Sequence, residues 1–392
     1  MSIEILGAAA LALTVPGSLY LGAVTAAAAL ARPGGDTCVD EDMDNGTDAL
    51  RVAIVVPAHN ESAGVLRTLY SLAMEVALDP NARVVVVADN CSDDTAAVAR
   101  GAGAQVLERQ DPLLRGKGCA LRHAFDIVTD ADWFIVVDVD TDVAPGFLAA
   151  MRGAMVDGVH ALQCRYGVRD PLASRRVALA DVALGGSNVL HPRGRAALGL
   201  SAGILGNGFA LSRRALQAVP YSACASVADE AYHHLLVRAG LRVHWVDGTA
   251  VRSDLPKARA AAGQQRARWE GGRLRLLKER GPGLLGQVLR GRWRQLGALL
   301  ELLLLPLAWH VVLLLAALLL GSKGVRLGAL AGLAGALLHT AVALVLIRAR
   351  REHLRALLGM PLYGVWKLHW AMATWRASQR QAAWSGSARG AR

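Results

Sequence analysis

Three apolar runs of the sequence each lead into acidic or amide side chains. Asn60 and Glu61 follow the first run, Asp89 ends the second, and Asp138 and Asp140 end the third. Because Asp138 and Asp140 stand two positions apart at the end of a predicted strand, both carboxylates point to the same side. Carboxylate oxygens suit a hard cation such as Mg²⁺ or Mn²⁺, which would offset the charge of a diphosphate. By itself, a pair of aspartates at this spacing is also compatible with a simple turn.

A lysine between two glycines adds a positive charge to this set. Lys and Arg together number 43, and only five of them are lysines, at positions 117, 257, 278, 323 and 367. Gly116 and Gly118 make the backbone around Lys117 flexible, and the ammonium supplies a point charge. In a chain so poor in lysine, we favour contact between Lys117 and a phosphate over a solvated surface lysine.

The elements that would position these side chains alternate between strand and helix. Short β-branched runs at 51–57, 83–89 and 133–140 are typical of strands buried on both faces, and helical stretches at 61–75 and 93–103 separate them. This order predicts an α/β domain with a mostly parallel sheet and right-handed crossovers. Ligands bind at the carboxyl ends of strands in such sheets, so we expect the polar clusters to share one crevice.

Three further segments are long and apolar enough to cross a bilayer. Residues 5–30, 302–320 and 327–347 contain no Asp, Glu, Lys or Arg, and about 20 apolar residues suffice for one span. Glu4 precedes the first segment and no basic stretch does, so we favour a retained anchor over a cleaved signal peptide. Arginines before the second span and after the third place both flanks in the cytoplasm. We therefore expect a multi-pass protein of the cell (inner) membrane whose α/β domain is cytoplasmic.

These segments also predict the domain order. We expect an N-terminal transmembrane anchor, an acidic linker, a cytosolic α/β domain, two transmembrane helices and a basic C-terminal segment, at 1–31, 32–50, 51–285, 286–347 and 348–392. In the last segment, tryptophans are interleaved with basic residues, which is typical of a helix lying among lipid headgroups. A surface helix packed on the cytosolic domain is the alternative.

Composition excludes several other classes of protein. Hydrophobic residues make up 53% of the 392 residues and charged residues 19%, which excludes a disordered chain and a small disulfide-rich domain. The five cysteines are widely spaced and form no CxxC pair, so we expect reduced thiols and neither a disulfide framework nor a zinc site. The net charge of +11 comes from an excess of arginine, from which we infer no binding of nucleic acid.

Seven short motifs lie between about residues 52 and 280. They are VVPAHNE (55–61), ADNCSDDT (88–95), RGKGCAL (115–121), VVDVDTD (136–142), LGNGFALSRR (205–214), ADE (228–230) and QQRARWEGGR (264–273). Together they resemble the family 2 glycosyltransferases, which are inverting enzymes with a GT-A (Rossmann-like) fold. The resemblance is strongest to their membrane-anchored branch, related to cellulose, hyaluronan and poly-N-acetylglucosamine synthases.

The resemblance implies a donor site at the strand ends. In such enzymes the first two motifs hold the nucleotide base and ribose, which implicates Pro57, Asn60, Glu61 and Asp89. The DxD residues Asp138 and Asp140 would bind the metal, Mg²⁺ or Mn²⁺, and Asp138 with Lys117 would meet the diphosphate of the nucleotide sugar.

Two later motifs imply contacts with both substrates. The QxxRW signature falls on Gln265, Arg268 and Trp269, where it is expected to hold the diphosphate end of the donor and the acceptor sugar. Trp269 is equally compatible with a place in the core. Asn207 and Gly208 would let the acceptor approach the backbone, and a plain turn is the alternative.

The catalytic base is where this chain departs from the family pattern. The family usually shows Glu-Asp, whereas this sequence has Ala228, Asp229 and Glu230. Aligned on the residues that follow, Asp229 matches the catalytic aspartate, and Glu230 is the less favoured base. A carboxylate suits this role because the acceptor hydroxyl must lose its proton as it attacks the anomeric carbon.

The predicted function is transfer of a sugar from a UDP-sugar to a lipid-linked or polysaccharide acceptor at the cytosolic face. Three spans are few for a protein that builds its own polysaccharide channel, so chain extension with a separate export protein stays open alongside transfer to a membrane lipid. The alternative from another class is a catalytically silent nucleotide-sugar-binding scaffold or sensor. Retention of Asp138, Asp140, Asp229, Arg268 and Trp269 argues against that alternative.

Overall fold

The computed structural model describes residues 3–32, 47–221, 228–255, 259–360, 370, 372–376 and 378. The chain forms two compact units. We call Arg32–Pro171, Ser201–Gly272 and Trp370–Arg392 the sheet unit, and Met1–Ala31, Leu172–Leu200 and Arg273–His369 the helical unit. Most of the predicted acidic linker and of the C-terminal segment beyond Met360 lies outside the described residues.

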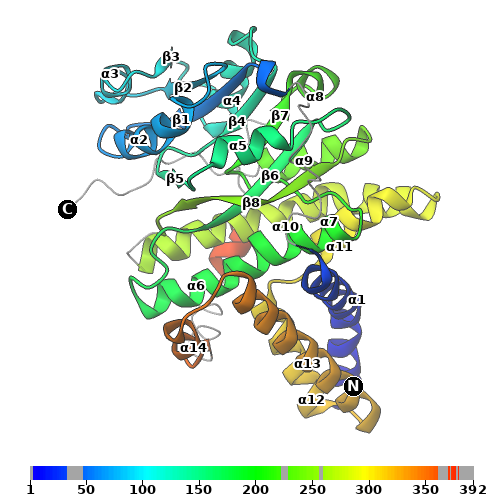
Figure 1. Cartoon of the computed structure of the whole chain (residues 1–392). Helices are drawn as coiled ribbons and strands as arrows, with labels where there is room; N and C mark the ends of the chain where they lie inside the picture. Colours follow the sequence, from blue (N-terminus) through cyan, green and yellow to red (C-terminus); the bar gives the residue numbers. More distant parts are fainter. Residues whose placement is uncertain are drawn as a thin grey trace. The chain divides into compact units, whose positions relative to one another are not determined.

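The sheet unit is built on one mixed sheet with the strand order β3-β2-β1-β4-β7-β6-β8-β5 (Figure 1). The first four strands are parallel, β7 is antiparallel to both β4 and β6, β6 is parallel to β8, and β5 is antiparallel to β8. The strands are β1 Val52–Ala58, β2 Ala82–Asp89, β3 Gln105–Arg109, β4 Trp133–Val136, β5 Thr141–Val143, β6 Ala161–Val168, β7 Phe209–Ser212 and β8 Val243–Ser253. The α/β fold with its parallel strands is confirmed.

Helices cover both faces of the parallel strands. Ile135 of β4 shares a core with Leu72 and Met151, whereas the ring of its neighbour Phe134 packs against Phe125 at 5.0 Å between centroids. Because successive strand residues point to opposite faces, α2 and α5 cover one face and α4 the other. The helices of this unit include η1 Thr47–Ala49, α2 Val65–Val76, α3 Thr95–Gly101, α4 Lys117–Ile127, α5 Phe147–Gly153, α8 Arg213–Ala218 and α9 Ala228–Arg238.

Two boundaries differ from the prediction. The first helix begins at Val65 instead of residue 61, because residues 59–64 form a loop that bonds to the segment after β2. Strand β4 ends at Val136, four residues before the predicted end, so that Asp138 and Asp140 lie on a loop. Both differences lengthen the irregular backbone at the carboxyl ends of the strands, where the polar clusters lie.

The helical unit contains the apolar helices. α1, α12 and α13 pack against one another (Figure 1). Their approach is close, since a Cβ added at Gly7 of α1 would lie 2.6 Å from the Cα of Gly321. The helices of this unit are α1 Ile3–Leu30, α6 Arg175–Gly185, η2 Gly186–Leu190, α7 His191–Ala197, η3 Trp293–Gln295, α11 Leu296–Leu303, α12 Leu307–Leu320, α13 Lys323–Leu346 and α14 Arg351–Leu357, and α10 Arg259–Leu289 contributes to both units.

Two described helices, α1 and α13, are long and apolar enough to cross a membrane. The predicted middle span differs from a single straight helix, because α11 and α12 meet at an angle of 71°. Pro306 lies in this break, and proline cannot donate a backbone hydrogen bond inside a helix. The described chain therefore has two candidate spans, or three if the bent pair counts as one.

The helical unit also buries charged side chains. The guanidinium of Arg195 pairs with the carboxylate of Glu301, and their side chains are 3% and 22% exposed. Arg193 donates to the carbonyl oxygens of Ala28 at 3.0 Å and Ala31 at 2.6 Å, which satisfies acceptors at the end of α1. These contacts fasten α1, α7 and α11 to one another.

Candidate active site

The loops after β1 and β2 are tied together by side chains from both. Asn60 has a φ of 54°, and its Oδ1 accepts from the amide of Ser92 at 2.8 Å. The amide of Glu61 donates to Oγ1 of Thr95 at 2.9 Å. Asn tolerates the left-handed conformation better than most residues, so Asn60 suits this sharp exit from the strand. Asn60 and Glu61 therefore lie beside the second polar cluster, as predicted.

Asp89 is fully buried at the end of β2. Its Oδ1 accepts from Nη1 of Arg109 at 2.6 Å, and Arg109 is the last residue of the neighbouring strand β3. Among the described residues, Oδ2 of Asp89 has no hydrogen-bond partner. A buried carboxylate oxygen without a donor is costly, so this oxygen is suited to accept from a ligand. Pro57 lies one strand away, buried within β1 and in register with Val87.

Lys117 joins the third polar cluster. It begins α4 after Gly116, whose φ of 128° is open to glycine, and its Nζ lies 2.5 Å from Oδ1 of Asp138. The ammonium also donates to the carbonyl oxygen of Gly206. Although burial lowers the pKa of Lys117, the carboxylates of Asp138 and Asp229 more than offset it and raise that pKa above its usual range. The lysine is therefore a permanent positive charge between two carboxylates.

Asp229 reaches the same place from α9. Its Oδ1 accepts from the hydroxyl of Tyr221 at 3.0 Å. A Cβ added at Gly206 would lie 2.8 Å from its Oδ2, so this oxygen faces the backbone of the loop before β7. Gly206 has a φ of 88°, which favours glycine at this position in any case. The structure thus brings Asp229, Lys117 and Asp138 together.

Asn207 and Gly208 lie inside the fold. Asn207 is fully buried, its Oδ1 accepts from the amide of Asp138 at 3.1 Å, and its Nδ2 donates to Oγ1 of Thr141 at 2.8 Å. A Cβ added at Gly208 would lie 2.5 Å from Sγ of Cys164. These contacts position the Asp138 loop, and the acceptor contact of Asn207 and Gly208 stays a prediction.

Asp140 lies on the same loop and faces residues that the sequence did not single out. Arg169 donates to the backbone oxygen of Asp140 at 2.7 Å and pairs with Asp142 at 2.5 Å. Burial, with the carboxylate of Asp138, raises the pKa of Tyr166 to about 12, and Asp140 adds to the shift. The hydroxyl of Tyr166 lies 2.9 Å from Oγ of Ser253. The salt bridge with Arg169 also holds Asp142 in place.

The donor chemistry of the loop fits a divalent cation. Asp138 and Asp140 are both partly exposed and supply carboxylate oxygens, the ligands that Mg²⁺ and Mn²⁺ favour. No group of three or more His, Cys, Asp or Glu side chains converges among the described residues. In proteins, Mg²⁺ is usually held by one or two carboxylates, and phosphate oxygens and water complete its coordination.

The QxxRW residues lie on α10. Gln265 is half-buried and Trp269 is 43% exposed, so Trp269 is not a core residue. The side chain of Arg268 lies outside the described residues. Glu230 follows Asp229 on α9 and is partly buried.

Three site residues were missed from the sequence. Arg109 pairs with Asp89, Tyr166 lies near Asp138, and Tyr221 donates to Asp229. None belongs to a motif, and each meets its partner across the fold or a loop.

The prediction that all cysteines are reduced also differs from the structure, since Cys119 is disulfide-bonded. Spacing in the sequence does not report which cysteines approach in space.

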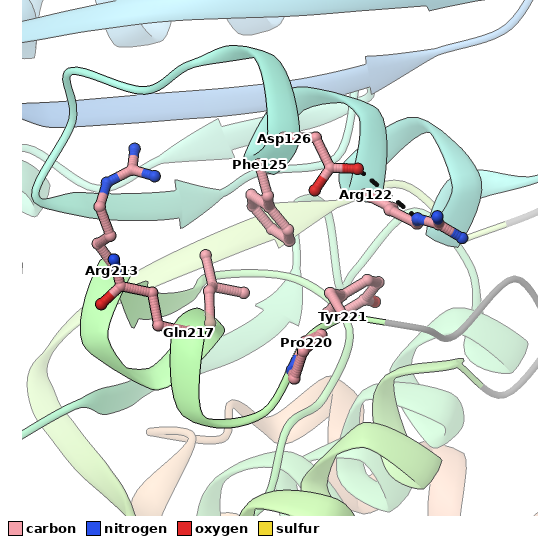
Figure 2. Close-up of a pocket in the computed structure, with 8 residues that line it drawn as sticks. Arg122, Phe125, Asp126, Arg213, Gln217, Pro220 and Tyr221 are labelled. Atoms are coloured by element: carbon pink, nitrogen blue, oxygen red, sulfur yellow. Dashed lines mark ion pairs between the residues drawn. The ribbon is translucent and has the colours of Figure 1, made fainter.

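Tyr221 also lines a cavity of about 490 Å³ between α4 and α8 (Figure 2). Figure 2 shows Phe125 and Tyr221 facing this space, with Arg122 and Asp126 forming an ion pair on α4. The lining is completed by Arg213, Leu216, Gln217 and Pro220. Neither Asp138 nor Asp229 lines it, so the cavity is separate from the polar cluster.

Comparison with known proteins identifies the family. Residues 49–272 match the protein family described as glycosyltransferase like family 2, over more than half of the chain. The chain belongs to this glycosyltransferase family. Such an enzyme uses nucleotide sugars, and this agrees with acidic clusters and a lysine at the strand ends. Protein RfbJ of Shigella flexneri is 33% identical over 92 residues, which span 24% of this glycosyltransferase and 66% of that protein.

Solved structures support the fold of this family 2 glycosyltransferase. Mannosyltransferase PcManGT from Pyrobaculum calidifontis, in complex with GDP-Man and Mn²⁺, has a TM-score of 0.55 at 17% identity, over 93% of this chain and 99% of its own. Glucosyl-3-phosphoglycerate synthase from Mycobacterium tuberculosis, in complex with Mg²⁺ and UDP, has a TM-score of 0.42 at 24% identity, over 60% of this chain and 80% of its own. The likeness to the mannosyltransferase confirms the GT-A fold, and the structure of that neighbour contains Mn²⁺.

Proposed function

We propose that the enzyme transfers a sugar from a UDP-sugar to a lipid-linked or polysaccharide acceptor with inversion at the anomeric carbon. The observation that carries this proposal is the meeting of Lys117, Asp138 and Asp229 at the carboxyl ends of the strands. The Lys117 ammonium can bind the negatively charged phosphates, and the Asp229 carboxylate can accept a proton. Family membership limits the reaction to glycosyl transfer.

Asp229 acts as the general base. An oxygen of the acceptor hydroxyl attacks the anomeric carbon, its proton passes to the carboxylate, and the bond from that carbon to the diphosphate oxygen breaks. Because the nucleoside diphosphate leaves from the face opposite the attack, one displacement inverts the configuration. Positive charge builds at the anomeric carbon during this step, as it does in glycoside hydrolysis.

The donor binds along the strand ends. Asp89 accepts from the base through its free buried oxygen, and Asn60 with Glu61 borders the ribose. Lys117 binds the diphosphate, and Asp138 and Asp140 would hold Mg²⁺ or Mn²⁺. That ion supplies charge neutralisation to the leaving diphosphate. Gln265, Arg268 and Trp269 approach the diphosphate end and the acceptor sugar, and the exposed face of Trp269 is free to stack on a sugar.

The proposed acceptor is reached at the membrane. α1 and α13 are candidate spans, and the arginine-rich flanks support a cytoplasmic position for the sheet unit. Membrane lipids therefore surround the helical unit, and a lipid-linked acceptor would reach the enzyme within the same bilayer. A polymer product would need a separate export protein. This setting agrees with the membrane-anchored branch that the QxxRW motif resembles.

The test is release of nucleoside diphosphate in native membranes from a panel of UDP- and GDP-sugars, with and without Mn²⁺. We expect metal-dependent release from one UDP-sugar, its loss in Asp229→Asn, and its retention in Asp130→Asn. Asp130 is the matched control, because it forms only a surface pair with Arg83 in the same domain. Release from GDP-sugars alone would overturn the choice of donor. Nucleotide binding without release, after lipid extract is added, would favour the silent scaffold.

A further inference from the structure

The side chain of Tyr221 donates a hydrogen bond to the Asp229 carboxylate. Its hydroxyl lies 3.0 Å from Oδ1, and its ring is buried, with 5% of the residue exposed. We propose that Tyr221 is a positioning residue that fixes the orientation of Asp229 for proton transfer. This inference rests on the proposed role of Asp229 as base.

The ring of Tyr221 is held from two sides. It meets Phe125 of α4 edge-on at 5.3 Å and Tyr232 of α9 at 4.6 Å between centroids. Phe125 in turn packs edge-on against Phe134 of β4 at 5.0 Å. Aromatic pairs at these distances have preferred geometries, so the row of rings fixes the hydroxyl relative to the sheet. Asp138 follows the same strand, so the ring packing orients the base Asp229 relative to the metal ligand Asp138.

The two oxygens of the Asp229 carboxylate have different surroundings. The Tyr221 hydroxyl donates to Oδ1, while Oδ2 faces Gly206, where a Cβ would approach to 2.8 Å. With Oδ1 occupied by a donor, Oδ2 is the oxygen left to accept the proton of the acceptor hydroxyl. Rotation about the bond to the carboxylate would break the hydrogen bond and exchange the two oxygens.

The phenol stays a donor under working conditions. Burial, together with the negative charge of Asp229, holds the pKa of Tyr221 well above its ordinary value. The charged groups that also act on Asp229 are the Lys117 ammonium and the Asp138 carboxylate. Neither replaces the tyrosine, since Lys117 donates to Asp138 and to the carbonyl of Gly206.

The test compares Tyr221→Phe with Tyr232→Phe in membranes that hold the full chain. Each variant removes one buried hydroxyl and keeps the ring, but Tyr232 donates to the carbonyl of Val219 at 2.7 Å. For Tyr221→Phe we expect kcat to fall roughly 10- to 100-fold, the effect of losing a hydrogen bond to a charged group. The KM for the donor should stay within about twofold, because the donor contacts are intact.

The pH profile gives a second readout. A donor to the carboxylate favours its charged form, so the loss of the Tyr221 hydroxyl should move the acidic limb of kcat to higher pH. Tyr232→Phe should leave that limb and kcat unchanged. Equal kcat values and equal limbs in both variants would overturn the positioning role.

Two further variants separate the possible failures. Phe125→Leu loosens the packing of the aromatic rings around Tyr221 and keeps both tyrosine hydroxyls. It should lower kcat at unchanged donor KM, and it can be measured even if Tyr221→Phe does not fold. No change in kcat would overturn the inference. Asp229→Asn tests the base itself. If Asp229→Asn retains turnover, the proposed mechanism is wrong. If Asp229→Asn loses turnover and Tyr221→Phe has no effect, only the proposed role of Tyr221 is wrong.

Discussion

The two units of this glycosyltransferase bury charge in opposite ways. In the sheet unit, the side chains of Lys117 and Asp138 stay 22% and 30% exposed, and one ammonium lies among two carboxylates. In the helical unit, Arg195 is 3% exposed and pairs with Glu301. The first arrangement is open and can exchange its partners for ligands, whereas the second is closed.

We infer that the charged groups of the sheet unit serve catalysis and that the buried pair of the helical unit serves packing. A site that binds phosphate and moves a proton needs charged groups whose partners can be replaced, and such groups gather at a cleft. A pair with one partner fully enclosed, such as Arg195 with Glu301, contributes little net stability, yet the loss of the other partner is costly because the enclosed charge remains buried. Substitutions in the two units should therefore separate turnover from stability.

The largest effect on turnover is expected in Asp229→Asn. Removal of a general base should lower kcat by about 100- to 10,000-fold. The asparagine keeps an acceptor for Tyr221, and relief of the repulsion between Asp229 and Asp138 offsets the lost attraction between Asp229 and Lys117, so the melting temperature should change little. Initial rates and thermal unfolding of the same detergent-solubilised sample check both statements. A large fall in melting temperature would place Asp229 among the packing charges.

Glu301→Gln should give the opposite result. The amide leaves the buried guanidinium of Arg195 without a counter-charge, which should cost about 3 kcal/mol, the lower end for a broken buried pair, because Glu301 is 22% exposed. Turnover per folded molecule should be unchanged. Thermal unfolding in detergent measures the loss, and the double variant Arg195→Met with Glu301→Gln should recover part of it. A kcat reduced at full stability would contradict this reading of the pair.

The fold was predictable because its signals are local. The runs that form β1 and β2 are rich in β-branched residues and are buried. An acidic or amide residue at the end of each run indicates a ligand-binding edge of the sheet, even when the order of the strands is unknown. Asp138 and Lys117 were found in the same way, one from its spacing and the other from its rarity.

What the sequence did not reveal depends on partners that are far apart or outside any motif. Arg109 reaches Asp89 through strand pairing, and Tyr221 reaches Asp229 across a loop, so neither has a local signature. The break at Pro306 was visible as a proline, but its angle depends on how α11 and α12 pack. Fold and motif residues were thus within reach, whereas the residues that orient them were not.

Gly206→Ala should affect both turnover and stability moderately. The new Cβ would lie 2.8 Å from Oδ2 of Asp229 and displace the carboxylate, and a shift of about 1 Å can cost on the order of 100-fold in rate. The φ of 88° adds roughly 1 to 2 kcal/mol of backbone strain. Gly240→Ala is the matched control, with a φ of 81° and nothing within 4 Å of its Cβ. It should show the strain with normal kcat, and equal rates in the two variants would remove steric displacement as the cause.

Asp181→Asn should have the smallest effect and sharpens the comparison within the helical unit. Nε2 of His353 lies 3.2 Å from Oδ2 of Asp181, and both side chains are largely buried. Asparagine can keep an acceptor at this position, and an imidazole, unlike a guanidinium, can remain neutral when its counter-charge is removed. The expected loss is therefore about 1 kcal/mol, the value of an ordinary hydrogen bond. Thermal unfolding beside Glu301→Gln measures it. A loss as large as in Glu301→Gln would mean that the helical unit depends on two buried side-chain pairs instead of one.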